Sequence, residues 1–143
     1  MAEALKEAGS ALSQDEVPIG AVIIFENKII ARGHNLTEKN SDPTAHAEMI
    51  AIKRAAEFLG GWRLHGCQLY VTIEPCPMCA GAIIQSRIDR LVYGARDLRA
   101  GAVGSVLNLF EYSTFNHHPQ VTAGIREEEC SHLMKEFFRS LRN

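Results

Sequence analysis

The sequence predicts an α/β protein with three layers (α/β/α), in which helices cover both faces of a central mixed five-stranded sheet. Apolar runs of strand length alternate with longer segments that keep their apolar side chains on one helical face. The first two predicted strands are joined by only two residues and form an antiparallel hairpin, whereas strands joined through a helix run parallel. The length of 143 residues, 46% of them hydrophobic, fits a single domain spanning 1–143.

The N-terminal part of the chain predicts a helix followed by the hairpin. Residues 2–13 repeat apolar side chains at spacings of three and four, which indicates a short helix with one buried face. The nearly unbroken apolar run at 17–25 is typical of a strand covered on both sides, with Pro18 near its start. After a tight turn at 26–27, residues 28–33 return as the second strand.

A polar loop beginning at His34 leads into the second predicted helix. We expect Asp42 to cap this helix and Pro43 to occupy its first position, with the helix ending at Leu59 before two glycines. The alternating, β-rich segment 67–73 predicts the third strand. Strand–helix–strand crossovers on either side of it predict parallel neighbours.

The C-terminal half completes the alternation. Pro75 and Pro77 are tolerated at a helix entrance and mark the start of a small-residue, buried helix. The remaining elements are this helix, a short strand, a glycine-containing loop, a helical turn, a fifth strand and an amphipathic helix, expected at 78–85, 90–93, 95–105, 106–110, 121–125 and 127–141.

Composition narrows the class of protein. No apolar run approaches the roughly 20 residues that cross a bilayer, and the first residues lack the basic-then-apolar order of a signal peptide. We therefore expect a cytoplasmic protein, without membrane contact, whose four cysteines stay reduced. The net charge of −2 argues neither for nor against nucleic acid, so a polyanion would need a local basic patch.

Three potential metal ligands lie at two predicted helix starts. His46 follows Asp-Pro-Thr-Ala, and the spacing of Cys76 and Cys79 directs both sulfurs to one side of a helix N-terminus, which stabilises thiolates. Alone, such a His is usually structural, and a Cys-x-x-Cys pair can be a redox dithiol or half of a structural zinc site. Together they supply three ligands, and three protein ligands with one open position are typical of catalytic Zn²⁺.

Glu48 falls on the apolar stripe of the second helix, in line with Ile52, Ala55 and Leu59. A carboxylate on a core face costs free energy unless it is paired or used in chemistry. An isolated Glu there is more often hydrogen-bonded to backbone. Two residues from His46, it is better explained as a group that exchanges a proton with water at the metal.

The combination of His-x-Glu with Pro-Cys-x-x-Cys is the established signature of zinc-dependent nucleobase deaminases. Over essentially its whole length, the chain resembles the bacterial tRNA-specific adenosine deaminases, which have a cytidine deaminase-like fold. The matching segments include Glu-Val-Pro-Ile-Gly-Ala-Val at 16–22, His-Asn at 34–35, Asp-Pro-Thr-Ala-His-Ala-Glu-Met at 42–49, the run from Leu69 to Ala82, Ser-Arg-Ile at 86–88, Gly-Ala-Arg-Asp at 94–97, Gly-Ala-Val-Gly-Ser at 101–105, Asn-His at 116–117 and Phe-Phe at 137–138.

The resemblance implies hydrolytic deamination of the wobble adenosine of a tRNA anticodon loop to inosine. One Zn²⁺ per chain would be held by His46, Cys76 and Cys79, with no organic cofactor. Glu48 would take a proton from water at the zinc and deliver it to the purine as ammonia leaves. The resemblance also implies a purine-binding Asn35, pocket walls formed by Ile19 and Ile73, and RNA contacts from Asp97 and Asn116. Its members are homodimers, and the anticodon stem-loop would reach across the subunit boundary.

The closing helix supports an RNA partner independently. Its basic side chains recur at spacings of four and three, at Lys135, Arg139 and Arg142. Basic groups beside aromatic rings are typical of surfaces that bind single-stranded RNA, so Phe138 and Arg142 are candidate contacts. The alternative is an ordinary solvated face with Leu133, Phe137 and Leu141 in the core. We expect Phe137 in the core and Phe138 nearer the substrate.

Three other functions stay open at this level. They are a deaminase of free bases or nucleosides such as guanine or cytosine, a non-catalytic zinc-containing tRNA-binding subunit, and a redox protein that uses Cys76 and Cys79. The basic stripe and the 94–105 segment argue against the first, and Glu48 argues against the second. His118 stands where the family often has arginine, which removes a fixed cation from the expected RNA path and makes binding more dependent on pH.

Overall fold

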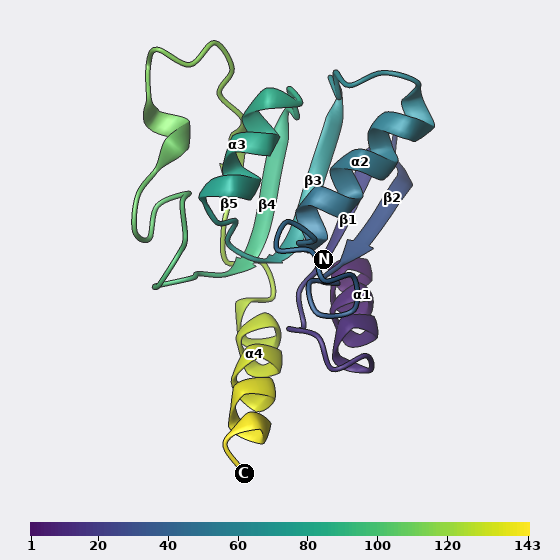
Figure 1. Ribbon diagram of the computed structural model, residues 1–143. Helices are drawn as coiled ribbons and strands as arrows, with labels where there is room; N and C mark the ends of the chain where they lie inside the picture. The colour runs from purple at the N-terminus through teal and green to yellow at the C-terminus, as the bar shows by residue number, and fades with distance from the viewer.

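A five-stranded sheet with the order β2-β1-β3-β4-β5 lies at the centre of the computed structural model, which describes residues 1–143 (Figure 1). Along the chain the elements are α1 (Ala2–Leu12), β1 (Gly20–Phe25), β2 (Lys28–His34), α2 (Ala47–Leu59), β3 (Cys67–Ile73), α3 (Pro77–Gln85), β4 (Arg90–Ala95), η1 (Leu109–Glu111), β5 (Gln120–Thr122) and α4 (Glu127–Leu141). Every predicted strand and helix is present, and the mixed sheet is confirmed.

Strand directions confirm one crossover prediction and correct the other. β3, β4 and β5 run parallel, as the β3–α3–β4 connection requires. β1 is antiparallel to both β2 and β3. The crossover from β2 through α2 therefore joins strands of the same direction that are not neighbours, because β1 lies between them. β1, the first strand of the hairpin, occupies the position between β2 and β3. The spacing of residues in the sequence does not predict that β1 pairs with β3.

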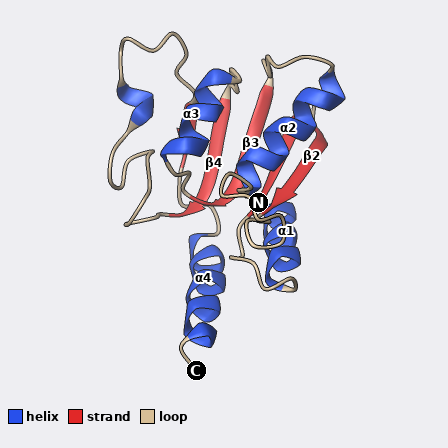
Figure 2. Ribbon diagram, in the orientation of Figure 1, coloured by secondary structure: helices blue, strands red, loops and turns tan.

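The register of the strands separates the two helical layers. Figure 2 shows α2 and α3 in front of the sheet. Gly33, Ala21, Val71 and Tyr93 form one row across the sheet, and α2 and α3 cover this face. The next row, with Gly20 and Gly94, faces the other way, towards α1 and α4. Since successive side chains of a strand point to opposite faces, the molecule has the three layers that the sequence predicts.

The second helix begins four residues later than expected. Its N-cap is His46, whose backbone is extended (φ −79°, ψ 153°), and Ala47 is the first helical residue. Asp42 does not cap the helix, because its Oδ1 accepts hydrogen bonds from the N–H of Thr44 at 2.8 Å and from its hydroxyl at 2.7 Å. Because the Asp42 carboxylate is hydrogen-bonded within this local turn, it does not cap the N-terminus of the helix.

Other boundaries shift by a few residues. β1 starts at Gly20, after Pro18, and α3 starts at Pro77. The fifth strand covers 120–122 and not 121–125, since Gly124 adopts a left-handed φ of 82° and turns the chain. The expected helical turn at 106–110 is a short 3-10 helix, η1, further along. None of the helices has both the length and the apolar character needed to span a membrane.

Candidate active site

The metal-ligand candidates meet because two helices start side by side at one edge of the sheet. His46 is the N-cap of α2, and Cys76 is the N-cap of α3, with Pro77 at the first helical position. Cys79 lies in the first turn of α3. The two helices contact each other on the same face of the sheet, so their N-termini bring the three side chains together.

The three ligand atoms converge closely enough to hold one metal ion. The His46 Nδ1 atom lies 3.6 Å from the Sγ atoms of both Cys76 and Cys79, and all three ligand atoms lie within 4.8 Å of one another. No other His, Cys, Asp or Glu joins this group, and all four cysteines are free. One imidazole and two thiols fit Zn²⁺, and they leave one tetrahedral position for water or substrate.

The two thiols have different proton affinities because they are hydrogen-bonded to each other. The hydrogen bond with Cys79, together with a hydrogen bond from His46, lowers the pKa of Cys76 to about 4, although burial acts in the opposite direction. The bond with Cys76, together with burial, raises the pKa of Cys79. The pKa of His46 is raised, chiefly by its hydrogen bond with Cys76. A divalent cation would replace the protons that this cluster holds.

Glu48 lies on the buried face of α2, as the helical pattern predicts, and is only 4% exposed. Burial raises the pKa of its carboxyl to about 7. At that value both protonation states are populated near neutral pH, which suits a group that accepts and returns a proton. Lys53, Arg54 and Glu57 are exposed on the opposite side of the helix, also as expected.

Asn35 and Ile19 lie beside the N-terminus of α2. The buried Asn35 side chain accepts a hydrogen bond at its Oδ1 from the N–H of Ala47, at 2.9 Å. Its backbone N–H donates to the carbonyl oxygen of Ile19, at 3.2 Å. No side chain or backbone group of the chain pairs with Asn35 Nδ2, and this atom is not fully buried. The amide group is therefore anchored next to His46 with a donor to spare.

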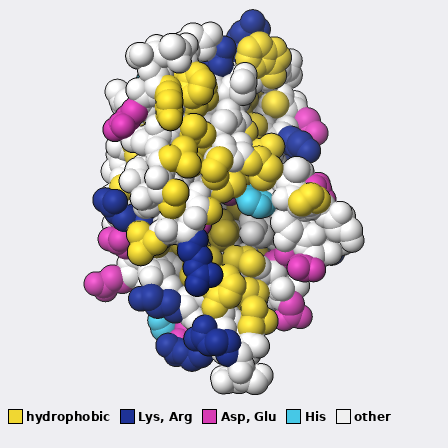
Figure 3. Space-filling view, turned by 60° about the vertical axis from the view of Figure 1, so that its left-hand side comes forward, with side chains coloured by type: hydrophobic (Ala, Val, Ile, Leu, Met, Phe, Trp, Pro, Cys, Tyr) yellow, Lys and Arg dark blue, Asp and Glu magenta, His cyan; other side chains and the backbone are white.

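A groove of about 600 Å³ joins the end of β4 to α4 and collects four of the predicted substrate residues, Ile73, Asp97, Phe138 and Arg142. Its charged lining residues comprise five cations and one carboxylate, at Arg96, Arg99, Lys135, Arg139, Arg142 and Asp97. Figure 3 shows Lys and Arg side chains gathered toward the lower, α4 end of the molecule. The chain thus has a local basic surface despite its net charge of −2.

The closing helix divides its aromatic residues as expected. Phe137 is buried, whereas Phe138 is 44% exposed and lines the groove, with the two ring centroids 5.3 Å apart. Leu133 is half-buried and Leu141 is 65% exposed. Of the three residues in the alternative core face, Leu133, Phe137 and Leu141, only Phe137 is therefore buried. Nothing packs over the last turn of α4 to cover Leu141.

Asn116 is not near the metal ligands of its own chain. It is exposed in the loop before β5, and the next residue, His117, hydrogen-bonds to the carbonyl oxygen of Ile88 at 2.6 Å. Ile88 follows the C-terminal end of α3, whereas Cys76 lies at its N-terminal end. His118 is exposed in the same loop and contacts the carbonyl oxygen of Tyr112 at 2.9 Å.

Two buried carboxylates escaped the sequence analysis. Glu74 is 2% exposed and accepts hydrogen bonds from the loop at 97–105, and Glu16 is 1% exposed and accepts from the loop at 36–41. Burial by itself would raise the pKa of Glu74, but the hydrogen bonds from Ser105 and its neighbours outweigh burial and lower it. The sequence feature that could have identified both residues is an acidic side chain directly beside an apolar segment of strand length.

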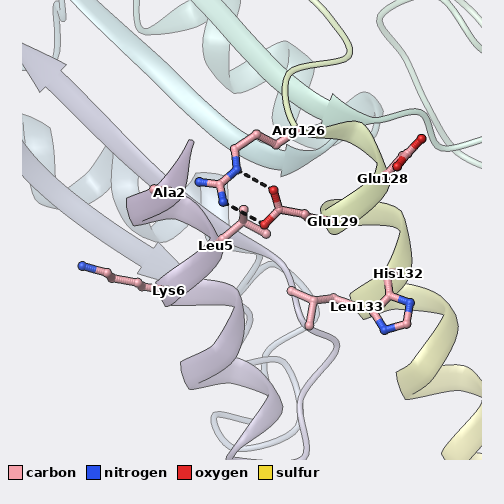
Figure 4. A pocket seen from close by; sticks show the side chains of 8 residues that line it. All are labelled: Ala2, Leu5, Lys6, Arg126, Glu128, Glu129, His132 and Leu133. Atoms are coloured by element: carbon pink, nitrogen blue, oxygen red, sulfur yellow. Dashed lines mark hydrogen bonds and ion pairs between the residues drawn. The ribbon is translucent and has the colours of Figure 1, made fainter.

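A second groove, about 760 Å³ in volume, lies between α1 and α4 (Figure 4). Its Arg126 donates hydrogen bonds to both carboxylate oxygens of Glu129, each at 2.8 Å. This larger groove contains none of the metal-ligand candidates or predicted substrate residues. The larger volume of this groove therefore does not identify it as the active site.

Comparison with known proteins gives consistent matches over nearly the whole chain. Residues 1–142 match the profile of the MafB19-like deaminases. The tRNA-specific adenosine deaminase of Bacillus subtilis (strain 168) is 51% identical over 142 residues, which cover 99% of this chain and 88% of that protein. The tRNA-specific adenosine deaminase of Agrobacterium fabrum (strain C58 / ATCC 33970) is 50% identical over 139 residues, covering 97% and 91%.

Solved structures agree with these matches. A structure from a study of A-to-I editing by tRNA:A34 deaminases superposes with a TM-score of 0.90 at 50% identity, covering 93% of this chain and 96% of that one. A guanine deaminase from Bacillus subtilis superposes with a TM-score of 0.66 at 33% identity, covering 99% and 90%.

Proposed function

The chain belongs to the MafB19-like deaminase family, and we propose that it is a tRNA adenosine deaminase that converts the wobble adenosine of an anticodon loop to inosine. The observation that carries this proposal is the pairing of a His-Cys-Cys centre and a buried Glu48 with a neighbouring groove lined by cations and an exposed aromatic ring. A free base would need the centre and the base-binding residues around it, but no groove for flanking nucleotides. A splayed RNA loop needs both parts.

The metal in this proposal is one Zn²⁺ per chain, held by His46, Cys76 and Cys79. Bound zinc would lower the pKa of a water molecule from about 15.7 to about 7 and so make it a nucleophile at neutral pH. The convergence of the three ligand atoms supports this choice of metal.

The residues of the chain divide the remaining work. Glu48 accepts a proton from water and returns it to the purine, and the exocyclic amine leaves as ammonia. The free Nδ2 of Asn35 donates to an acceptor on the base, while Ile19 and Ile73 form apolar walls around it. Burial of Glu48 supports its role, because it raises the pKa of the carboxyl above its ordinary value and so favours uptake of a proton.

The groove binds the nucleotides around the target base. Lysine and arginine side chains, Arg142 among them, neutralise phosphates, and Phe138 offers a face for stacking. Asp97, which also lines the groove, accepts a hydrogen bond from a ribose hydroxyl in this proposal. Asn116 lies away from its own centre, and a homodimer would give it a route to the partner's RNA. We also propose a cytoplasmic location, where tRNA meets the ribosome.

The decisive test offers the zinc-loaded protein an anticodon stem-loop with adenosine at the wobble position. Nucleosides are released afterwards and inosine is measured by mass spectrometry. We expect inosine from this substrate, and none from a stem-loop whose wobble adenosine is moved to the stem. Turnover of free guanine or cytosine with an inert stem-loop would identify a free-base deaminase instead.

A companion experiment tests the role of Glu48. Glu48→Ala is expected to keep the fold and about one zinc per chain, but to lose at least ~10²-fold in turnover, as for other general acid–base groups. Metal content is measured on the same samples. Near wild-type turnover of this variant would remove Glu48 from the mechanism, and a disulfide in place of zinc would favour a redox protein.

A further inference from the structure

Glu74 is a buried carboxylate that is satisfied by the backbone of one loop. Its Oε2 accepts hydrogen bonds from the N–H groups of Val103 at 3.0 Å and Ser105 at 3.1 Å. Its Oε1 accepts from the N–H of Asp97 at 3.2 Å and from the hydroxyl of Ser105. Four donors from residues 97–105 therefore converge on one side chain, and hydrogen bonds to a charged group are stronger than those between neutral groups.

The loop is shaped to fit this carboxylate. Gly101 lies so close that a Cβ atom there would overlap the Glu74 carboxylate and the carbonyl oxygen of Asp97. The N–H of Ala102 donates to the carbonyl oxygen of Pro75 at 2.9 Å. The segment 97–105 is thus docked onto the two residues that immediately precede Cys76.

The same loop forms one wall of the cationic groove. Asp97, Leu98 and Arg99 all line the groove. The Asp97 Oδ1 atom turns back to accept hydrogen bonds from the N–H groups of Arg99 at 3.0 Å and Ala100 at 3.1 Å. The positions of these groove residues therefore depend on how the loop backbone is held.

We propose that Glu74 is a positioning residue for the RNA substrate: it fixes the 97–105 loop, and with it one wall of the groove, relative to the metal ligands of α3. This inference rests on the proposed function. Charge and geometry predict opposite effects of its removal. Neutralising an acidic group near the groove would strengthen binding of a polyanion through charge alone, whereas loosening the loop weakens it.

The test compares Glu74→Gln with Glu16→Gln in the zinc-loaded full chain. Glu16 is the matched control, because it is equally buried and holds the 36–41 loop, which does not line the groove. Glutamine keeps the size of the side chain but replaces one acceptor oxygen with a donor. For the stem-loop we expect Glu74→Gln to raise KM and Kd about tenfold with kcat and zinc content little changed, and Glu16→Gln to leave KM unchanged.

Two further measurements separate positioning from general damage. In an Asp97→Ala background, Glu74→Gln should raise KM by a clearly smaller factor, because Asp97 is one of the groups that Glu74 positions. Amide hydrogen exchange at 97–105 should become faster in Glu74→Gln, whereas in Glu16→Gln only the 36–41 loop should exchange faster. This exchange measurement needs no substrate, so it stands even if the stem-loop proves inert.

Unchanged exchange at 97–105, tighter binding of the stem-loop, or an equal rise in KM for Glu16→Gln would overturn the proposal. Should Glu74→Gln fail to fold, Ser105→Ala takes its place, because it removes only one of the four donors. It is expected to shift KM and exchange in the same direction by a smaller factor, and no shift in either would count against Glu74.

Discussion

The residues that converge on the metal site illustrate how helix starts tune side-chain chemistry. Cys76 at the N-cap of α3 has a pKa near 4, while Cys79, one turn further, keeps its proton. The hydrogen bond from Cys79, with a smaller contribution from His46, favours a single negative charge on Cys76, and a second thiolate at Cys79 would need a cation to balance it. Binding of a cation at this candidate metal site would therefore be linked to ionisation of the thiols.

Alkylation of the cysteines tests this linkage. After zinc is removed, iodoacetamide at pH 6 is expected to label Cys76 first, since its pKa of about 4 makes it a thiolate at that pH. Burial raises the pKa of Cys67 and of Cys130 to about 11, so both stay unreactive thiols. Peptide mass spectrometry reads the sites.

Zinc should protect Cys76 in the same experiment, while any label on Cys67 or Cys130 reports unfolding. Equal labelling of Cys76 with and without zinc would show that this thiol does not bind the metal. The grouping of His46, Cys76 and Cys79 and the burial of Glu48 were predictable from the sequence, because their spacing places them at helix starts and on a core-facing helical stripe. The role of Glu74 was not predictable, because its partners are three backbone N–H groups and one hydroxyl that lie 23 to 31 residues away in the chain.

At the scale of elements, two glycines allow two helices to approach the sheet. A Cβ at Gly33 would overlap the carbonyl oxygen of Ala47 in α2, next to His46. A Cβ at Gly20 would overlap backbone atoms of Ala4 and Ala8 in α1, on the opposite face. Both glycines are similarly crowded by a helix backbone. Only α2, the helix that packs on Gly33, carries a potential metal ligand, His46.

Substitution of these glycines therefore separates stability from metal binding. Both Gly33→Ala and Gly20→Ala are expected to lower the free energy of unfolding by about 1–3 kcal/mol, as overpacked sites do. Only Gly33→Ala should also weaken zinc binding, because it pushes the first turn of α2 off the sheet and so shifts His46 relative to the cysteines of α3. Urea unfolding and competition with a chelator provide the two measurements, and weaker zinc binding in Gly20→Ala would refute this view of α2.

For the whole molecule, the distribution of charge matters more than its sum. The net charge is −2, yet the groove beside α4 carries five cations and one carboxylate. A polyanion is therefore attracted to one region of an acidic protein. The groove exists only because the end of β4 and the closing helix meet in the folded chain.

Salt dependence of stem-loop binding tests this arrangement. Lys135→Gln removes a groove cation and should reduce the slope of log Kd against log salt by about 0.7, the value for one phosphate contact on a single strand. Lys28→Gln is the control, because Lys28 is exposed in the β1–β2 hairpin and does not line the groove. Equal slopes for both variants would exclude the groove as the RNA path.

The sequence by itself determined the alternation of strands and helices, the group of three potential metal ligands and the position of Glu48 on a buried helical face. These features follow from local periodicity and from the chemistry of closely spaced side chains. Only the tertiary structure decided that β1 separates β2 from β3, that His46 caps α2, and that Glu74 holds the groove wall. Each of these depends on contacts between segments distant in the chain, where packing and backbone hydrogen bonds outweigh local preference.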